Sequence, residues 1–420
     1  MKKIFSVAII GCGSRGLDVY AFNMVETKGF EIVSVCDKRE TRIERAKELY
    51  SINPDNCFLD ENEFFKEKRA DVLVIATQDR DHVRQCIKAL EKGYDVLLEK
   101  PISPNKEECL ALLSAHKKYG GKVIVCHVLR YAPAYKKAAE LIDSGAIGKL
   151  IDINALEQVG YWHIAHSFVR GNWRNSIETS PMILAKCCHD MDLLQYFAKS
   201  KAKSVSSIGD LSYFKKENQP KGASSRCHEC KYDKSCPYSA YRIYVERWKE
   251  AGSPETMWPQ NVVCLDNPLT EEKIINAYRN NQYGRCVFSC DNDVVDHETT
   301  NILFENGVTA NLTMIGFTQT NSRIYRFHGT KGEIVLDEER KELSIKPFGE
   351  KTTIYPFSAI LKTEVGHGGG DLGLIEALYD SLIGGQDLST ALEQSIESHL
   401  MAFAAEASRL KEGEAINPHE

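Results

Sequence analysis

Lys100 stands in the segment Glu-Lys-Pro at residues 99–101, directly after an apolar run that ends at Leu98. In a doubly wound α/β sheet, the carboxyl ends of the strands face the crevice where ligands bind. A lysine amine at such a place can position a reacting hydroxyl group or exchange a proton with it. The alternative is a surface lysine that precedes a proline turn.

A glycine-rich turn, GCGSRG, occupies residues 11–16 and follows the apolar run 5–10. The spacing G-x-G-x-x-G between a strand and a helix is typical of dinucleotide binding, because backbone amides at the helix start hold the pyrophosphate. A second apolar run ends in Asp37, where a carboxylate can bind a ribose 2′-hydroxyl. The predicted cofactor-binding residues here are Gly11, Gly13, Ser14, Arg15, Gly16 and Asp37.

Asp37 favours NAD, because a 2′-phosphate would meet its negative charge. Lys38 and Arg39 follow it, so the sequence is also compatible with NADP. An α/β domain with an empty glycine turn is the alternative to a cofactor site.

Short apolar runs rich in Val and Ile alternate with helical patterns over residues 1–128. This alternation predicts a Rossmann-type, doubly wound parallel sheet. The predicted strands are 5–10, 31–37, 71–77, 94–99 and 122–128, and the predicted helices include 40–50, 79–93 and 105–121.

Residues 129–420 show a different pattern and predict a second, α+β domain with an open, mostly antiparallel sheet. Strand patterns dominate from residue 293, and ENG and TKG segments look like hairpin turns. The other predicted elements are a helix at 133–148, a strand at 150–160, a loop at 161–180, a helix at 181–199, and helices at 371–385 and 389–413.

Four segments together resemble the Gfo/Idh/MocA oxidoreductases, the family of glucose–fructose oxidoreductase and inositol dehydrogenase. They are GCGSRG (11–16), TQDRDH (77–82), EKP (99–101) and RYAPAYKKAAELIDSGAIGKL (130–150). The resemblance implies a Rossmann domain whose nicotinamide is covered by the second sheet, and homodimers or homotetramers formed through that sheet. It implies that Lys100 positions or deprotonates the reacting hydroxyl, and that Thr77, His82 and Glu99 lie beside the cofactor.

The family's second-domain signature has an aspartate four residues before a histidine and another aspartate three residues after it. His189 and Asp192 match it, whereas Ala185 replaces the first aspartate and Lys186 stands next to it. We expect His189 and Lys186 to be catalytic with Lys100, Lys186 lowering the pKa of His189 by repulsion from the same helix face. The alternative is an ion pair between Lys186 and Asp190.

Polar side chains and aromatic rings alternate in the loop 161–180, a composition suited to a polyhydroxylated ligand. The segment GHGGGD at 366–371 offers His367 and Asp371, either to close over a substrate or to start a helix. The predicted substrate-binding residues are His163, His166, Arg170, Trp173, Arg174, Asp192 and His367.

Cys227, Cys230 and Cys236 lie in a polar segment of about residues 215–290 that lacks strand patterns. Three cysteines at this spacing predict a structural zinc that would stabilise the insertion. The fourth ligand is left open among His228, Cys264, Cys286 and Cys290. Reduced, packed cysteines are the alternative.

The net charge of −6 and the absence of long basic runs argue against a nucleic-acid partner. The start MKKIFSVAII is better explained by a first strand than by a signal peptide, and no segment is long enough to cross a membrane. We therefore expect a cytoplasmic enzyme with a small carbohydrate substrate.

Hydride transfer between a nicotinamide cofactor and a secondary alcohol of a sugar or cyclitol is the expected activity. One alternative is an NAD-dependent glycoside hydrolase that works by transient oxidation, elimination, hydration and re-reduction. Another is a non-catalytic, nicotinamide-responsive binding protein.

Overall fold

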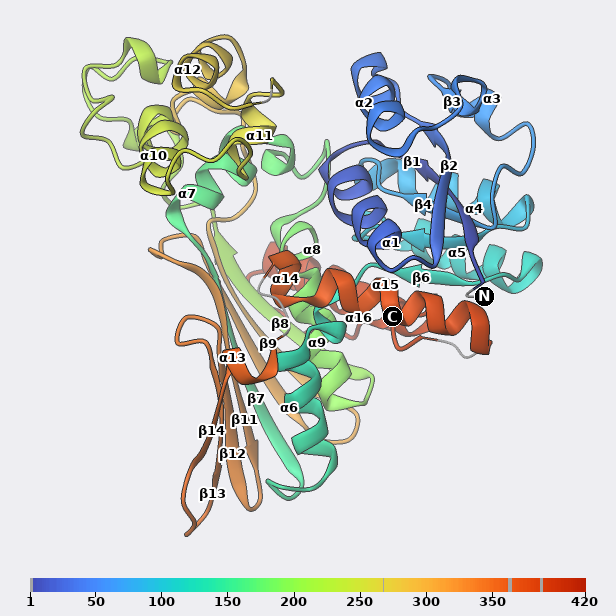
Figure 1. Ribbon diagram of the computed structural model, residues 1–420. Helices are drawn as coiled ribbons and strands as arrows, with labels where there is room; N and C mark the ends of the chain where they lie inside the picture. Colours follow the sequence, from blue (N-terminus) through green and yellow to red (C-terminus); the bar gives the residue numbers. More distant parts are fainter. Residues whose placement is uncertain (1–2, 267, 362–364, 386–387) are drawn as a thin grey trace.

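The computed structural model describes residues 3–266, 268–361, 365–385 and 388–420 (Figure 1). Its amino-terminal part is a six-stranded parallel sheet in the order β3-β2-β1-β4-β5-β6, as the alternating pattern predicts. The strands are β1 (Phe5–Ile10), β2 (Phe30–Cys36), β3 (Cys57–Phe58), β4 (Val72–Ile75), β5 (Asp95–Leu98) and β6 (Val123–Val125).

Helices connect these strands and cover both faces of the sheet. α5 starts where the Asn105 side chain accepts a hydrogen bond from the Glu108 amide, and it ends at Gly120. The helical segments are η1 (Ser14–Ala21), α1 (Phe22–Glu26), α2 (Glu40–Tyr50), η2 (Pro54–Asn56), α3 (Glu61–Phe64), η3 (Asp79–Asp81), α4 (His82–Glu91) and α5 (Lys106–Tyr119).

The second sheet has eight strands in the order β14-β13-β12-β11-β7-β10-β9-β8. Only the central pair β7–β10 is parallel among its described pairings, so the predicted open, mostly antiparallel sheet is confirmed. The strands are β7 (Leu150–Val159), β8 (Ala202–Asp210), β9 (His297–Phe304), β10 (Thr309–Ile315), β11 (Asn321–Gly329), β12 (Gly332–Asp337), β13 (Glu342–Pro347) and β14 (Thr353–Pro356).

Two expectations for the segment between β7 and β8 are wrong. The predicted loop 161–180 contains helical turns: α7 (Tyr161–His163), η5 (Ile164–Arg170) and η6 (Asn172–Arg174). The predicted helix 181–199 is two helices, α8 (Met182–Ala185) and α9 (Cys188–Ala198). Lys186 and His189 are therefore not neighbours on one uninterrupted helix.

The carboxyl-terminal helices join the two sheets. In Figure 1, α15 (Gly370–Gly384) lies against the Rossmann sheet, where Tyr379 packs edge-on against Phe5 and Phe30. α16 (Leu392–Leu410) contacts both β6 and β8. The helices that precede them are η4 (Val128–Tyr131), α6 (Pro133–Asp143), α13 (Phe357–Ile360) and α14 (Val365–Gly368).

The insertion at about residues 215–290 is helical and has no strand longer than an isolated bridge among its described residues. It buries Tyr244, Trp248, Ile274 and Phe288 in the same apolar core as the second sheet. Its helical segments are η7 (Lys216–Asn218), η8 (Cys227–Glu229), η9 (Tyr241–Glu246), α10 (Arg247–Glu250), α11 (Gln260–Val263), α12 (Glu271–Asn280) and η10 (Gln282–Gly284). Within the described part of the chain, none of the helices combines the length and hydropathy of a membrane span.

Candidate active site

The glycine-rich turn is shaped to let a ligand approach its backbone. Gly11 has φ +94°, and a Cβ there would lie 2.3 Å from the Ala76 carbonyl oxygen. A Cβ at Gly16 would lie 2.1 Å from the Gly11 carbonyl oxygen, so close helix–strand packing requires glycine at this position. A Cβ at Gly13 would meet nothing within 4 Å, which leaves open space beside the start of η1. This cradle fits a pyrophosphate.

Asp37 lies at the carboxyl end of β2 next to this turn. Its Oδ2 accepts a 2.9 Å hydrogen bond from the Cys12 amide, and its Oδ1 accepts one of 2.9 Å from the Arg39 amide. The carboxylate therefore stands beside the glycine turn at the place where a ribose would lie. The residues present fit a dinucleotide.

Arg15 and Glu99, both predicted cofactor-binding residues, bind each other. Arg15 Nε lies 2.6 Å from Glu99 Oε1, and its Nη2 lies 2.8 Å from Asp371 Oδ1. Burial opposes the ionisation of Glu99, but Arg15 and Lys100 outweigh it and hold the pKa of Glu99 below its ordinary value. This cluster ties the glycine turn to the start of α15.

Lys100 reaches from the end of β5 to the second domain. Its Nζ donates a 3.0 Å hydrogen bond to the carbonyl oxygen of Ala185, the last residue of α8. Its own amide donates to Glu99 Oε2 at 2.8 Å, which fixes the backbone at the Lys-Pro step. The strand end thus places an ammonium group close to the helix that carries His189.

His189 is buried, and its Nδ1 has no hydrogen-bond partner among the described residues. Burial lowers its pKa well below the ordinary value, and the positive charge of Lys100 adds to this effect. His189 is therefore a neutral imidazole. The expected repulsion from Lys186 is not its cause, because the nearby positive charges are Lys100 and Arg323.

Four histidine rings lie in one group beside Lys100. The His127 ring centroid lies 6.2 Å from that of His189 and 5.8 Å from that of His399, while His367 lies 5.6 Å from His189. Burial lowers the pKa of His127 well below its ordinary value and that of His399 to about 3. His127 and His399 were not predicted, because a lone histidine in sequence carries no sign of its neighbours.

Lys186 forms an ion pair with Glu157 of β7 at 2.9 Å, so the alternative pairing with Asp190 is wrong. Asp190 instead binds Arg323 at 2.9 Å and accepts a hydrogen bond from Tyr325. Arg323 also lies 2.8 Å from Glu157. Burial raises the pKa of Glu157, against the effect of the two cations. Glu157 is a site residue that sequence reasoning missed.

Asp192 faces away from bulk solvent and is bound by Arg130. Two Arg130 nitrogens, Nε and Nη2, each lie 2.7 Å from an Asp192 oxygen, and both side chains are almost fully buried. This pair joins η4 to α9 and holds the helix that carries His189. The geometry gives Asp192 a positioning contact and shows no direct opening to a substrate.

The loop after β4 connects the two domains. His82 is buried, with its Nδ1 2.8 Å from the Pro101 carbonyl oxygen and its Nε2 3.3 Å from that of Thr77, so it holds the loop against the Lys-Pro step. Asp79 of this loop accepts a 2.6 Å hydrogen bond from the Ser180 hydroxyl. Sequence reasoning missed this contact, since its partner lies 101 residues away.

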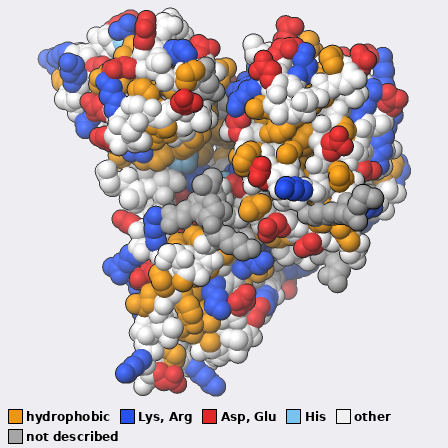
Figure 2. All heavy atoms as spheres, viewed as in Figure 1, with side chains coloured by type: hydrophobic (Ala, Val, Ile, Leu, Met, Phe, Trp, Pro, Cys, Tyr) orange, Lys and Arg blue, Asp and Glu red, His pale blue; other side chains and the backbone are white. Residues whose placement is uncertain are grey.

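Aromatic rings from the insertion pack on the first turns after β7. The His166 ring stacks on Tyr283 at 4.7 Å, and His163 contacts Trp258 at 5.0 Å. Trp258 is 41% exposed. Figure 2 shows the surface hollowed between the insertion and the Rossmann domain. The histidines of 161–170 thus join the insertion to the second sheet.

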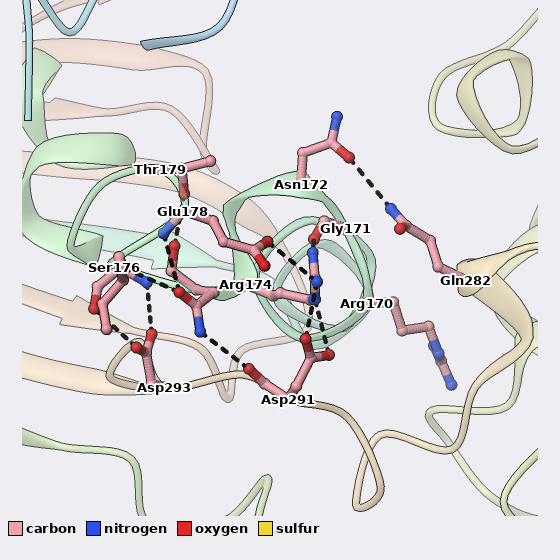
Figure 3. A network of polar contacts seen from close by, with 12 residues as sticks. Arg170, Gly171, Asn172, Arg174, Ser176, Glu178, Thr179, Gln282, Asp291 and Asp293 are labelled. Carbon is pink, nitrogen blue, oxygen red and sulfur yellow. Dashed lines mark hydrogen bonds and ion pairs between the residues drawn. The ribbon is translucent and has the colours of Figure 1, made fainter. Parts of the chain in front are cut away.

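The remaining predicted substrate-binding residues of this loop make contacts within the protein. Arg174 pairs with Asp291 at 2.9 Å, and Figure 3 shows this network with the Arg170 side chain directed elsewhere. Arg170 is fully buried and donates to the carbonyl oxygens of Arg285 and Tyr238. Trp173 Nε1 lies 3.4 Å from Asp79 Oδ1. Of these three, Trp173 lies nearest to the loop that follows β4.

Cys227, Cys230 and Cys236 line a small cavity together with Cys286 and Arg170. Cys227 and Cys286 are buried, and the other two are half-buried. Among the residues that the structure describes, no group of three His, Cys, Asp or Glu side chains is arranged to hold a metal ion. The insertion also contains a substantial apolar core, so the expected lack of apolar content is wrong. The zinc stays a prediction.

Family models match nearly the whole chain. The model described as "Oxidoreductase family, NAD-binding Rossmann fold" matches residues 5–127, and the model described as "Oxidoreductase family, C-terminal alpha/beta domain" matches residues 139–413. The chain belongs to the Gfo/Idh/MocA oxidoreductase family, which confirms the resemblance.

Individual relatives are distant. YteT of Bacillus subtilis (strain 168) is 24% identical over 394 residues, which cover 89% of this chain and 88% of YteT. Inositol 2-dehydrogenase of Salmonella typhimurium is 24% identical over 198 residues, which cover 47% of this chain and 55% of that enzyme. The structure of levoglucosan dehydrogenase with NADH and levoglucosan has a TM-score of 0.72, 18% identity and full coverage of both chains. That likeness shows a shared fold.

Proposed function

We propose that the protein is an NAD-dependent dehydrogenase that oxidises a secondary alcohol of a sugar or cyclitol. The observation that carries this proposal is the placement of Lys100, whose Nζ extends from the strand end beside the glycine turn to Ala185, near the neutral His189. A cation and a neutral imidazole thus lie together at the crevice outside the parallel strands.

Gly11, Gly13 and Gly16 would hold the pyrophosphate, and Asp37 would hold the adenosine ribose. When bound, NAD supplies the hydride acceptor. The Asp37 carboxylate, which takes two amide hydrogen bonds at the end of β2, would repel a 2′-phosphate and therefore supports NAD over NADP.

Lys100 donates a hydrogen bond to the substrate hydroxyl and stabilises negative charge on its oxygen as the proton leaves. His189, which burial and Lys100 keep neutral, accepts a hydrogen bond from the substrate hydroxyl and orients it. The ion pair between Arg130 and Asp192 holds α9 in position. The ion pairs of Glu157 with Lys186 and Arg323 fix the adjoining part of β7.

The proposal is tested by incubating the protein with NAD and a panel of sugars, cyclitols and aryl glycosides, while reduced cofactor and released aglycone are both followed. Reduced cofactor that accumulates with a sugar or cyclitol supports the dehydrogenase. Aglycone release without net reduction would assign the glycoside hydrolase instead. Binding of NADH without turnover of any compound would favour the binding protein.

A further inference from the structure

We propose that His367, oriented by Asp371, is a further catalytic residue that takes the proton of the reacting hydroxyl. This inference rests on the proposed dehydrogenase activity and adds to it a carboxylate–histidine pair. His367 Nδ1 lies 3.0 Å from Asp371 Oδ2. Because a carboxylate accepts only, the proton resides on Nδ1 and leaves Nε2 as an acceptor.

His367 lies at the histidine group and is partly open. Its ring centroid lies 5.6 Å from that of His189, and its side chain is 37% exposed, compared with 2% for Asp371. Apart from the bond to Asp371, its ring makes no other hydrogen bond among the described residues. An imidazole with one fixed and one free nitrogen is thus available at the site.

The carboxylate is held ionised behind the imidazole. Burial opposes the ionisation of Asp371, but the charge of Arg15 and the hydrogen bond from His367 outweigh it and hold its pKa below the ordinary value. Arg15 binds both Asp371 and Glu99, so the pair is anchored to the glycine turn. A fixed carboxylate orients the imidazole and stabilises the imidazolium that forms on proton uptake.

The backbone conformation at residues 366 and 367 allows the contact between His367 and Asp371. A Cβ at Gly366 would lie 2.7 Å from Asp371 Oδ2, so glycine admits the carboxylate. His367 itself has φ +52°, a conformation that is uncommon for residues other than glycine. Backbone strain of this kind persists where the surrounding structure enforces it.

His189 lacks such a partner. Its Nδ1 is buried without a hydrogen bond, and the aspartate that the family has four residues earlier is Ala185 here. The pair Asp371–His367 supplies the carboxylate-assisted proton acceptor from another part of the chain. Lys100, Arg323 and His127 are the other charged or titratable groups around His189 at this position.

The carbinol oxygen gives its proton to His367 Nε2, and the carbinol carbon gives its hydride to the nicotinamide ring of NAD. The C–O single bond becomes a carbonyl, the substrate loses two electrons, and NAD gains them. His367 becomes an imidazolium beside Asp371 and later releases the proton to solvent.

Asp371→Asn is the first test, with Asp380→Asn on the exposed face of the same helix as the matched control. We expect kcat to fall about 100-fold in Asp371→Asn, with NADH affinity nearly unchanged, because the amide no longer stabilises the imidazolium. The acid limb of the kcat/KM profile moves to lower pH, since losing a neighbouring negative charge disfavours the charged imidazole. The pKa of the His367 ring, measured by NMR titration without cofactor, should also be lower in this variant than in the wild type.

His367→Gly is the second test and suits the left-handed backbone at this position. We expect loss of turnover that added imidazole partly restores. Unchanged turnover and an unchanged acid limb in both variants, with an active wild-type protein, would overturn the inference and leave the dehydrogenase standing. A folded wild-type protein that binds NADH but turns over none of the panel would overturn both.

Discussion

Lys100 Nζ and the Ala185 carbonyl oxygen, 3.0 Å apart, join the end of β5 to the end of α8. The hydrogen bond brings an ammonium group of the Rossmann domain to the helix pair that carries His189. Ala185 stands where the family has an aspartate, so the backbone carbonyl takes a contact that a carboxylate side chain could otherwise make. This relationship defines how the two domains share one site.

Replacing Lys100 by Met should abolish most turnover while the cofactor still binds. We expect kcat to fall about 100-fold or more, because the hydroxyl loses its charged hydrogen-bond donor. NADH affinity, followed by fluorescence, should stay nearly constant. Lys117→Met, at an exposed position of α5, is the control. Equal turnover in the two variants would remove Lys100 from the mechanism.

Gly13→Ala and Gly16→Ala separate binding from folding. A Cβ at position 13 meets nothing within 4 Å of the protein, so the melting temperature should hardly change. The methyl group enters the space of the pyrophosphate, and NADH affinity should fall at least about tenfold, or 1.4 kcal/mol. A Cβ at position 16 would lie 2.1 Å from a backbone oxygen, so Gly16→Ala should unfold at a clearly lower temperature. Full NADH affinity in Gly13→Ala would contradict the proposed cradle.

Asp192→Asn should destabilise the fold by about 3 kcal/mol, because it leaves the buried Arg130 without its charge partner. Urea unfolding of Asp192→Asn, of Arg130→Met and of the double variant Arg130→Met/Asp192→Asn measures this. The double variant should be more stable than the sum of the single losses predicts. A normal unfolding midpoint in Asp192→Asn, together with a raised KM, would instead assign Asp192 to substrate binding.

The free energy of unfolding should fall as the pH is lowered from 7 to 5. The pKa values of His127, His189 and His399 are depressed in the folded protein, mainly by burial, so the unfolded chain takes up more protons below its ordinary histidine pKa. Each of the three contributes a loss of about 1.4 kcal/mol per pH unit below about pH 6.5. Urea unfolding across this range should show that the free energy of unfolding depends less steeply on pH in His127→Asn than in the wild type. An equally steep dependence in His127→Asn would contradict a contribution of the buried histidines.

Local patterns were sufficient for most of the Rossmann domain. The predicted strand 5–10 and helix 40–50 coincide with β1 and α2. Both were predictable because a buried strand and an amphipathic helix each produce a pattern in residues that are close together in sequence. β14, at the edge of the second sheet, and β13 beside it were missed, since such short strands carry little apolar pattern. The break at Lys186 was missed because the apolar pattern continues across it.

The sequence alone determined the chemistry that is available: a glycine turn, an acid after β2, Lys100 after β5 and His189 on a helix. Their types and spacings are local properties, and they indicated the family. The tertiary structure decided which groups act together. Lys186 forms an ion pair with Glu157 of β7, and Arg15 binds Asp371, which lies 356 residues further along the chain. The packing of sheets and helices in space brings each buried charge next to an opposite charge. Spacing along the chain does not reveal such partners.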